Sequence, residues 1–266
     1  MSRGRASLVA AAALVVWAAA AFSAELSRAG MVLLPAGSYT PFLRLKAPNA
    51  SAPSPRNVVT IGAFRLDVEP VTNAEFLDFV TAHPEWHRSR IKPLFADDRY
   101  LRRWSGDLAL ADAQARDEPV TNVSWFAAEA YCRALGSRLP TTEQWEYAVA
   151  DGGRDRDGAR ERSLEWFAEP NPARPPAIGS GSANGYGVRD MIGLVWEWTL
   201  DFDAYATAAE SRDPNGKDGA LVCGGAAAGA TDPTDYPGFM RFSMRASLKA
   251  NYTADNVGFR CAAGAS

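Results

Sequence analysis

Residues 184–198 read Asn-Gly-Tyr-Gly-Val-Arg-Asp-Met-Ile-Gly-Leu-Val-Trp-Glu-Trp, and this stretch says more about the fold than any other. Asp190 and Glu197 supply hard carboxylate oxygens, and Gly193 between them permits a turn that exposes backbone carbonyls. Two carboxylates and two or three carbonyls are ligands that a calcium ion takes. The spacing therefore indicates a calcium site; the alternative is an acidic surface beside two core tryptophans.

The composition around this stretch is that of an ordinary globular protein. The chain has 266 residues, of which 47% are hydrophobic and 22% charged, which excludes a disordered, collagen-like or coiled-coil protein. Its net charge of −3 gives no reason to expect a nucleic acid as partner. With two histidines and three cysteines, a four-cysteine zinc site and a three-histidine metal site are both excluded.

The first 24 residues have the pattern of an export signal. Arg3 and Arg5 form a basic start, followed by the apolar run 6–21 and a small-residue exit that ends at Ala24. The alternative is an uncleaved N-terminal anchor. Cleavage predicts a signal peptide over 1–24, a mature domain over 25–266 and a periplasmic or secreted protein. No later segment is apolar enough to span a bilayer, so we expect no membrane association after cleavage.

Helix and strand signals are short and widely spaced along the mature chain. The region 151–187 is rich in Gly, Pro, Arg and Asp and predicts a long ordered loop. One compact α+β domain with little regular secondary structure follows from this pattern. Helices are expected over Ala74–Val80, over Trp125–Leu135 with Ser124 as N-cap and Gly136 as stop, and from the capping box Thr141–Gln144 to about Ala150. Strands are expected over Met31–Leu34, Val58–Leu66 and Leu221–Cys223.

The cysteines are Cys132, Cys223 and Cys261. In an exported protein an odd number indicates one disulfide and one free thiol. The count alone leaves all three pairings open.

Six motifs in order give the sequence a resemblance to a known family. They cover about residues 31–263 and together resemble the formylglycine-generating enzyme (sulfatase-modifying factor) family. The resemblance implies a single compact domain with a fold related to that of C-type lectins. The motifs are Met-Val-Leu-Leu-Pro-Ala-Gly at 31–37, Val-Thr-Asn-Ala-Glu-Phe at 71–76, Gly-Ser-Arg-Leu-Pro-Thr-Thr-Glu-Gln-Trp-Glu-Tyr at 136–147, Asn-Gly-Tyr-Gly at 184–187, Gly-Leu-Val-Trp-Glu-Trp at 193–198 and Gly-Phe-Arg-Cys at 258–261.

The resemblance also implies a structural calcium ion and a disulfide. The calcium ligands would be the side chains of Asp190 and Glu197 and the backbone oxygens of Gly193 and Val195. The family more often has Asn at the first position, and Asp keeps the oxygen donor there. A second calcium site of the family is not carried over, because 151–182 lacks matching ligands. The family's disulfide corresponds to Cys132 with Cys261, leaving Cys223 free.

Copper chemistry is not expected. Family enzymes oxidise a substrate cysteine to formylglycine with two cysteines that bind copper(I), placed after a Gly-Gly pair. Here residues 224–229 read Gly-Gly-Ala-Ala-Ala-Gly, and no cysteine occurs from 224 to 260. The copper cysteines are therefore absent, and calcium is the one cofactor that the resemblance implies.

No catalytic residue is assigned, but three candidates lie near the family's active site: Trp196, Cys223 and Arg245. Cys223 is either a reactive thiol or a small buried residue. Arg241 and Arg245 belong to a segment that resembles the family's substrate groove, with a strand bearing a solvated basic face as the alternative. His83 and His87 have ligand spacing but no third ligand, so a surface turn beside a core tryptophan is preferred.

Three functions compete. Segments 86–90, 95–104, 193–202 and 239–249 look most like the NirV-type members that accompany copper nitrite reductases, which implies an exported accessory or maturation factor with a protein or peptide partner. A second possibility is an oxidoreductase like the pyoverdine-maturation branch, which also lacks the copper cysteines. A third is a calcium-dependent, lectin-like binding protein.

Overall fold

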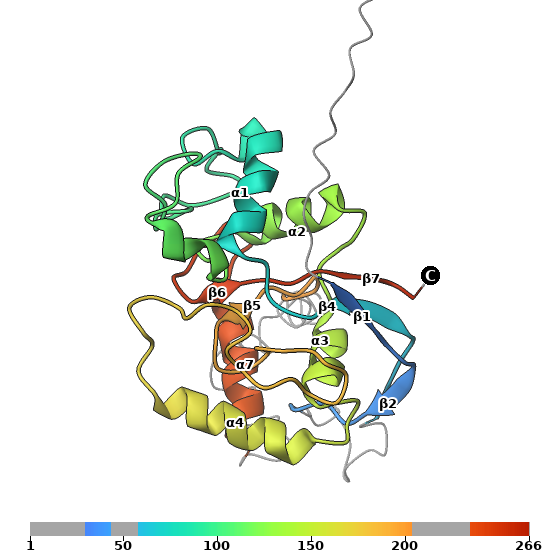
Figure 1. Ribbon diagram of the computed structural model, residues 1–266. Helices are drawn as coiled ribbons and strands as arrows, with labels where there is room; N and C mark the ends of the chain where they lie inside the picture. Colours follow the sequence, from blue (N-terminus) through green and yellow to red (C-terminus); the bar gives the residue numbers. More distant parts are fainter. Residues whose placement is uncertain (1–29, 44–57, 204–234, 266) are drawn as a thin grey trace, which may run out of the picture.

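Three small sheets connect distant parts of the chain in the computed structural model, which describes residues 30–43, 58–203 and 235–265 (Figure 1). β1 (Met31–Leu34), β4 (Phe64–Asp67) and β7 (Ala262–Gly264) form an antiparallel sheet in the order β1-β4-β7. The late strand thus pairs with an early one. The other pairs are β2 (Gly37–Tyr39) with β3 (Val59–Ile61), antiparallel, and β5 (Trp196–Glu197) with β6 (Val257–Gly258), parallel.

Side-chain caps define where three helices begin. Thr72, Ser124 and Thr141 each accept a backbone N–H from the first helical turn, and the two threonines complete capping boxes. The predicted helices are confirmed to within two residues at either end. They are α1 (Asn73–Ala82), α2 (Trp125–Ala134) and α3 (Thr142–Val149), and two short 3-10 helices accompany them, η1 (Pro84–Trp86) and η2 (Ala113–Asp117).

Two longer helices correct the sequence analysis. The region 151–187 was expected to be loop throughout, but it contains α4 (Arg156–Ala168). The strand alternative for the segment around Arg241 is also wrong, because this segment belongs to α7 (Tyr236–Ser247). Within the described residues, none of the helices has the length and apolar character needed to cross a lipid bilayer.

Paired arginines explain why α4 forms despite its polar sequence. Arg156 and Arg160 donate to the carboxylate of Asp235, at 2.9 and 3.2 Å, and this carboxylate is 2% exposed. Asp235 also accepts the N–H of Gly238 in the first turn of α7. A buried carboxylate therefore joins α4 to the start of α7, and the two helices lie next to each other in Figure 1.

Two hydrophobic clusters form the core. The larger one lies against α1 and α2, where the rings of Phe76, Tyr131 and Phe259 pack with centroids 5.3 to 6.1 Å apart. The smaller one lies between β1, β4 and α3 and includes Leu34 and Tyr147. The predicted strand Val58–Leu66 is two strands, β3 and β4, and the predicted strand Leu221–Cys223 lies outside the described residues.

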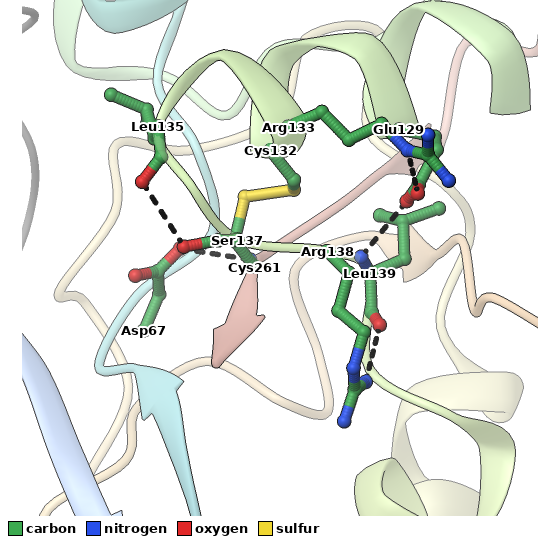
Figure 2. Close-up of a disulfide and its surroundings, with 9 residues drawn as sticks. All are labelled: Asp67, Glu129, Cys132, Arg133, Leu135, Ser137, Arg138, Leu139 and Cys261. Carbon is green, nitrogen blue, oxygen red and sulfur yellow. Dashed lines mark hydrogen bonds and ion pairs between the residues drawn. A yellow bond between two sulfur atoms is a disulfide. The ribbon is translucent and has the colours of Figure 1, made fainter. Parts of the chain in front are cut away.

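The Cys132–Cys261 disulfide is present and joins α2 to the C-terminal segment (Figure 2). Its two cysteines are fully buried, and the N–H of Cys261 donates to the carboxylate of Asp67 at 2.8 Å. One turn earlier in α2, Glu129 accepts the N–H of Leu139 at 3.1 Å. The disulfide thus lies where a helix, a loop and the central sheet meet.

Candidate functional site

Three tryptophans and two arginines line a narrow cleft between α3, α4, β5 and α7. The cleft has a volume of about 20 Å³, close to the space of one water molecule. We call it the tryptophan–arginine cleft. Its principal residues are Trp145 from α3, Trp166 from α4, Trp196 from β5, and Arg241 and Arg245 from α7.

The aromatic wall is built by contacts between α4 and β5. The ring centroid of Trp196 lies 5.0 Å from that of Trp166 and 5.4 Å from that of Phe167, with which it is stacked. Such ring pairs add to the stabilisation that burial gives. The neighbouring rings Trp166 and Phe167 both face one β5 side chain, so α4 forms one side of the cleft.

Arg241 is almost completely buried in this wall. Its guanidinium lies 4.4 Å from the ring centroid of Trp145 and 5.9 Å from that of Trp196. It donates to the hydroxyl of Ser163 on α4 at 3.1 Å, but its Nε has no hydrogen-bond partner among the described residues. Burial lowers the pKa of Arg241 to about 10, so the side chain remains charged at neutral pH.

Arg245 follows one turn later on the same side of α7. Its nearest carboxylate oxygen belongs to Glu146, 3.9 Å away, and its buried Nε also lacks a partner among the described residues. Glu146 already accepts the hydroxyl of Tyr39 at 3.3 Å and the N–H of Phe42 at 3.2 Å. Two guanidiniums therefore share one carboxylate, which leaves the cleft positively charged.

The acidic side chain that lines the cleft, Glu197, forms an ion pair with Arg260. Both side chains are 0% exposed. Arg260 donates through Nε and Nη2 to the Glu197 carboxylate at 2.8 to 3.0 Å, and Trp145 donates its ring N–H at 2.7 Å. The remaining Arg260 donors bind backbone carbonyls of Asp67, Val68 and Arg189. Glu197 therefore chiefly balances Arg260, and its charge favours the protonated form of Arg241 less than that of Glu146 does.

The residues of the predicted calcium site face two different hollows. Asp190 accepts the N–H groups of Gly179 and Gly181, and it lines a cavity of about 430 Å³. Glu197, like Val195, lines the tryptophan–arginine cleft instead. A calcium ion bound by all the expected ligands would have to share Glu197 with the guanidinium of Arg260. The calcium site stays a prediction.

Backbone conformation in the same stretch agrees with its role as a turn. Asp190 has a φ of +56° and Gly193 a φ of +98°, values that L-residues with side chains adopt rarely. A side chain at Gly193 would meet no atom within 4 Å, so its need for glycine is conformational.

The remaining sequence candidates divide into three cases. Trp196 and Arg245 lie together in the cleft, whereas Cys223 lies outside the described residues. His83 packs on the ring of Phe79, with centroids 4.8 Å apart, and His87 pairs with the carbonyl of Val80 at 3.0 Å. Nowhere in the described ranges do three or more His, Cys, Asp or Glu side chains cluster as metal ligands would.

Comparison with known proteins assigns the family. The family described as "Sulfatase-modifying factor enzyme 1-like domain" matches residues 18–265. The chain belongs to this family. Within the sulfatase-modifying factor family, it is similar to the formylglycine-generating enzyme of Streptomyces coelicolor, with 31% identity over 80% of this chain and 82% of the relative. It is also similar to the inactive C-alpha-formylglycine-generating enzyme 2 of Bos taurus, with 26% identity over 88% of each chain.

A named oxygenase and one solved structure are similar as well. Hercynine oxygenase of Mycolicibacterium smegmatis is 35% identical over 54% of this chain, but the match spans only 39% of that protein. The solved structure of PvdO from Pseudomonas aeruginosa has 20% identity and a TM-score of 0.52, covering 88% of this chain and 94% of PvdO. This likeness confirms the expected fold.

Sequence reasoning missed two of the cleft's tryptophans. Trp145 was part of a recognised motif without a role, and Trp166 lay in a region expected to be loop. The adjacent aromatic pair Trp166-Phe167 was a usable signal, because two large aromatic side chains side by side are uncommon in a solvent-exposed loop.

Proposed function

We propose that this chain is an exported, non-catalytic accessory protein that holds a segment of another exported protein or peptide at the tryptophan–arginine cleft. The observation that carries the proposal is the pair Arg241 and Arg245, whose buried Nε atoms lack partners among the described residues. A carboxylate or carbonyl of a bound segment would accept hydrogen bonds from Arg245, the more exposed of the two, while Arg241 adds positive charge behind it. The tryptophan rings would cover an apolar side chain.

The size of the cleft limits how such a segment binds. A hollow of about 20 Å³ admits little more than one water molecule, so the segment would lie across the opening. Contacts would then come from the outer edge of Arg245, whose side chain is 14% exposed, and from the half-buried rings of Trp166 and Trp196. Such an edge suits reversible recognition better than enclosure of a small substrate.

A non-catalytic role is supported by what the sequence lacks. No cysteine occurs from 224 to 260, where the family's copper-binding pair is expected. The similarity to a relative named an inactive C-alpha-formylglycine-generating enzyme is consistent with loss of the oxidation in this chain. Similarity to hercynine oxygenase favours an oxidoreductase as the second candidate.

We propose a copper nitrite reductase system as the source of the partner. The support is the resemblance of segments 193–202 and 239–249 to NirV-type proteins. These two segments contribute Trp196, Arg241 and Arg245 to the cleft, so the resembling segments include cleft residues.

Binding of a purified copper nitrite reductase, measured by surface plasmon resonance, tests this function. Arg245→Gln is expected to weaken binding at least about tenfold, because one charge-assisted hydrogen bond is lost. Arg133→Gln on α2 is the control, since that side chain is 75% exposed and pairs only with Glu129 among the ion pairs of the described residues. Equal affinities for both variants, or no binding by the wild type, would contradict the proposal.

A second assay separates the accessory role from catalysis. Incubation with copper, oxygen and a Cys-x-Pro-x-Arg peptide is expected to leave the peptide mass unchanged. Conversion of the cysteine to formylglycine would refute the non-catalytic role, and stoichiometric iron or copper in the purified protein would favour the oxidoreductase.

A further inference from the structure

A second basic site lies away from the tryptophan–arginine cleft. Arg99, Arg102 and Arg103 line a cavity of about 630 Å³ together with the segments 171–173 and 254–256. Three parts of the chain that are distant in sequence meet here: the region after η1, the residues that follow α4, and the turn before β6. Nothing in the proposed function uses this cavity.

One carboxylate organises the three arginines. Arg102 donates through Nε to Oδ1 of Asp255 at 2.7 Å and through Nη2 to Oδ2 of the same carboxylate. Arg99 donates to Oδ2 at 3.1 Å, and Nε of Arg103 lies 3.9 Å from Oδ1. Bidentate pairing of this kind holds a guanidinium in a fixed plane. Asp255 therefore orders the cluster before any ligand arrives.

The cluster keeps an excess of positive charge. Among the described residues that line the cavity, Asp255 alone is acidic, so two of the three positive charges are unbalanced. A hydrogen bond from Nη1 of Arg103 to the carbonyl of Ala173, at 2.8 Å, connects the arginine cluster to the segment 171–173. Asp255 and Ala173 occupy only part of the N–H donors that three guanidiniums carry.

All three arginine side chains are partly exposed to solvent, although Nε of Arg103 itself is buried and has no hydrogen-bond partner among the described residues. The side chains of Arg99 and Arg102 are 46% and 43% exposed, and that of Arg103 is 30% exposed. Two further lining residues, Asn171 and Asn256, carry amide groups that can donate to an oxygen. The cavity thus combines positively charged guanidiniums held in place, neutral amide donors and access from solvent.

We propose that this cavity binds a phosphate group. A phosphate dianion matches the two unbalanced charges, and its tetrahedral oxygens accept from several arginine forks at once. A carboxylate ligand would neutralise one charge only. Inorganic phosphate and a phosphomonoester present the same group, and their relative affinities show whether the free anion or an ester is preferred.

Isothermal titration calorimetry with inorganic phosphate and with phenyl phosphate, at constant ionic strength, tests the proposal. The wild type is expected to bind at least one of them in a saturable manner, and acetate much more weakly. Arg99→Gln is expected to raise the Kd at least about tenfold, because it removes a charged donor while leaving the Arg102–Asp255 pair in place.

Arg162→Gln is the matched control. Arg162 is 44% exposed and pairs with Asp155 at 2.8 Å, much as Arg99 pairs with Asp255, but it lines the other large cavity. Both variants change the net charge equally, so a general electrostatic effect would weaken phosphate binding in both. Equal Kd values for the two variants, or no phosphate binding by a wild type with a normal circular dichroism spectrum, would overturn the proposal.

Discussion

Removing the charge of Glu197 is expected to destabilise the protein, because the guanidinium of Arg260 is then buried without a counter-ion. Glu197→Gln keeps a hydrogen-bond acceptor for Trp145 but leaves Arg260, which is 0% exposed, without a counter-ion. Loss of one partner of a buried ion pair costs about 3–5 kcal/mol, which for a domain of this size lowers Tm by about 6–20 °C. The guanidinium of Arg260 cannot easily turn toward water, because it also donates three hydrogen bonds to the carbonyls of Asp67, Val68 and Arg189.

Glu129→Gln provides the comparison. Glu129 is also buried and also binds an arginine, at 2.7 Å, but that arginine is 75% exposed and regains water when the charge is lost. We expect this variant to lose less than about 1 kcal/mol, because its backbone acceptor role toward Leu139 persists in the amide.

Differential scanning calorimetry and urea unfolding of the oxidised protein measure both effects. A double variant, Glu197→Leu with Arg260→Met, is expected to be more stable than Glu197→Gln alone, since an apolar pair avoids the unpaired charge. A Glu197→Gln variant that melts within about 2 °C of the Glu129→Gln variant would refute the reasoning.

Three other expectations concern the rest of the fold. Chelator is expected to lower the Tm of the wild type and not that of Asp190→Ala; identical wild-type melting with and without chelator would argue against a structural calcium ion. Replacing Cys132 and Cys261 by serine is expected to cost up to about 5 kcal/mol, because the bridge closes a loop of 129 residues, and non-reducing peptide mapping should recover the pair. Ser124→Ala is expected to cost about 1 kcal/mol in urea unfolding, because the buried hydroxyl that caps α2 by accepting the N–H of Ala127 is lost.

Local signals explain which elements were predictable. The starts of α2 and α3 depend on Ser124 and Thr141, whose hydroxyls bond N–H groups only three residues away. By contrast, α4 buries only Ala159 and Ser163 and is held through Asp235, more than 70 residues later. No local sequence pattern indicates such a distant partner, so the sequence alone predicts a loop here.

The candidate site follows the same rule: residues in recognisable motifs are predictable from the sequence, and contacts between distant residues are not. Trp196 is predictable because it lies in a motif shared with the sulfatase-modifying factor family, and Arg245 because its segment resembles the family's substrate groove. The ion pair between Glu197 and Arg260 is not predictable, because the two residues are 63 positions apart. A glutamate beside two tryptophans also fits a metal ligand. Only the fold decides which cation a buried carboxylate faces.

The segment from β6 to β7 determines when the molecule can become stable. Phe259 enters the larger core, Arg260 neutralises Glu197, Cys261 bonds to Cys132 and Ala262 pairs with Arg138. Translation produces this segment after every described partner that it contacts. A nascent chain that ends before Val257 lacks Phe259 of the core, the counter-ion of Glu197, the disulfide partner of Cys132 and strand β7. The domain therefore cannot complete its fold until synthesis is nearly finished. If the protein is exported as we propose, this late completion would favour passage through the membrane before the domain has folded.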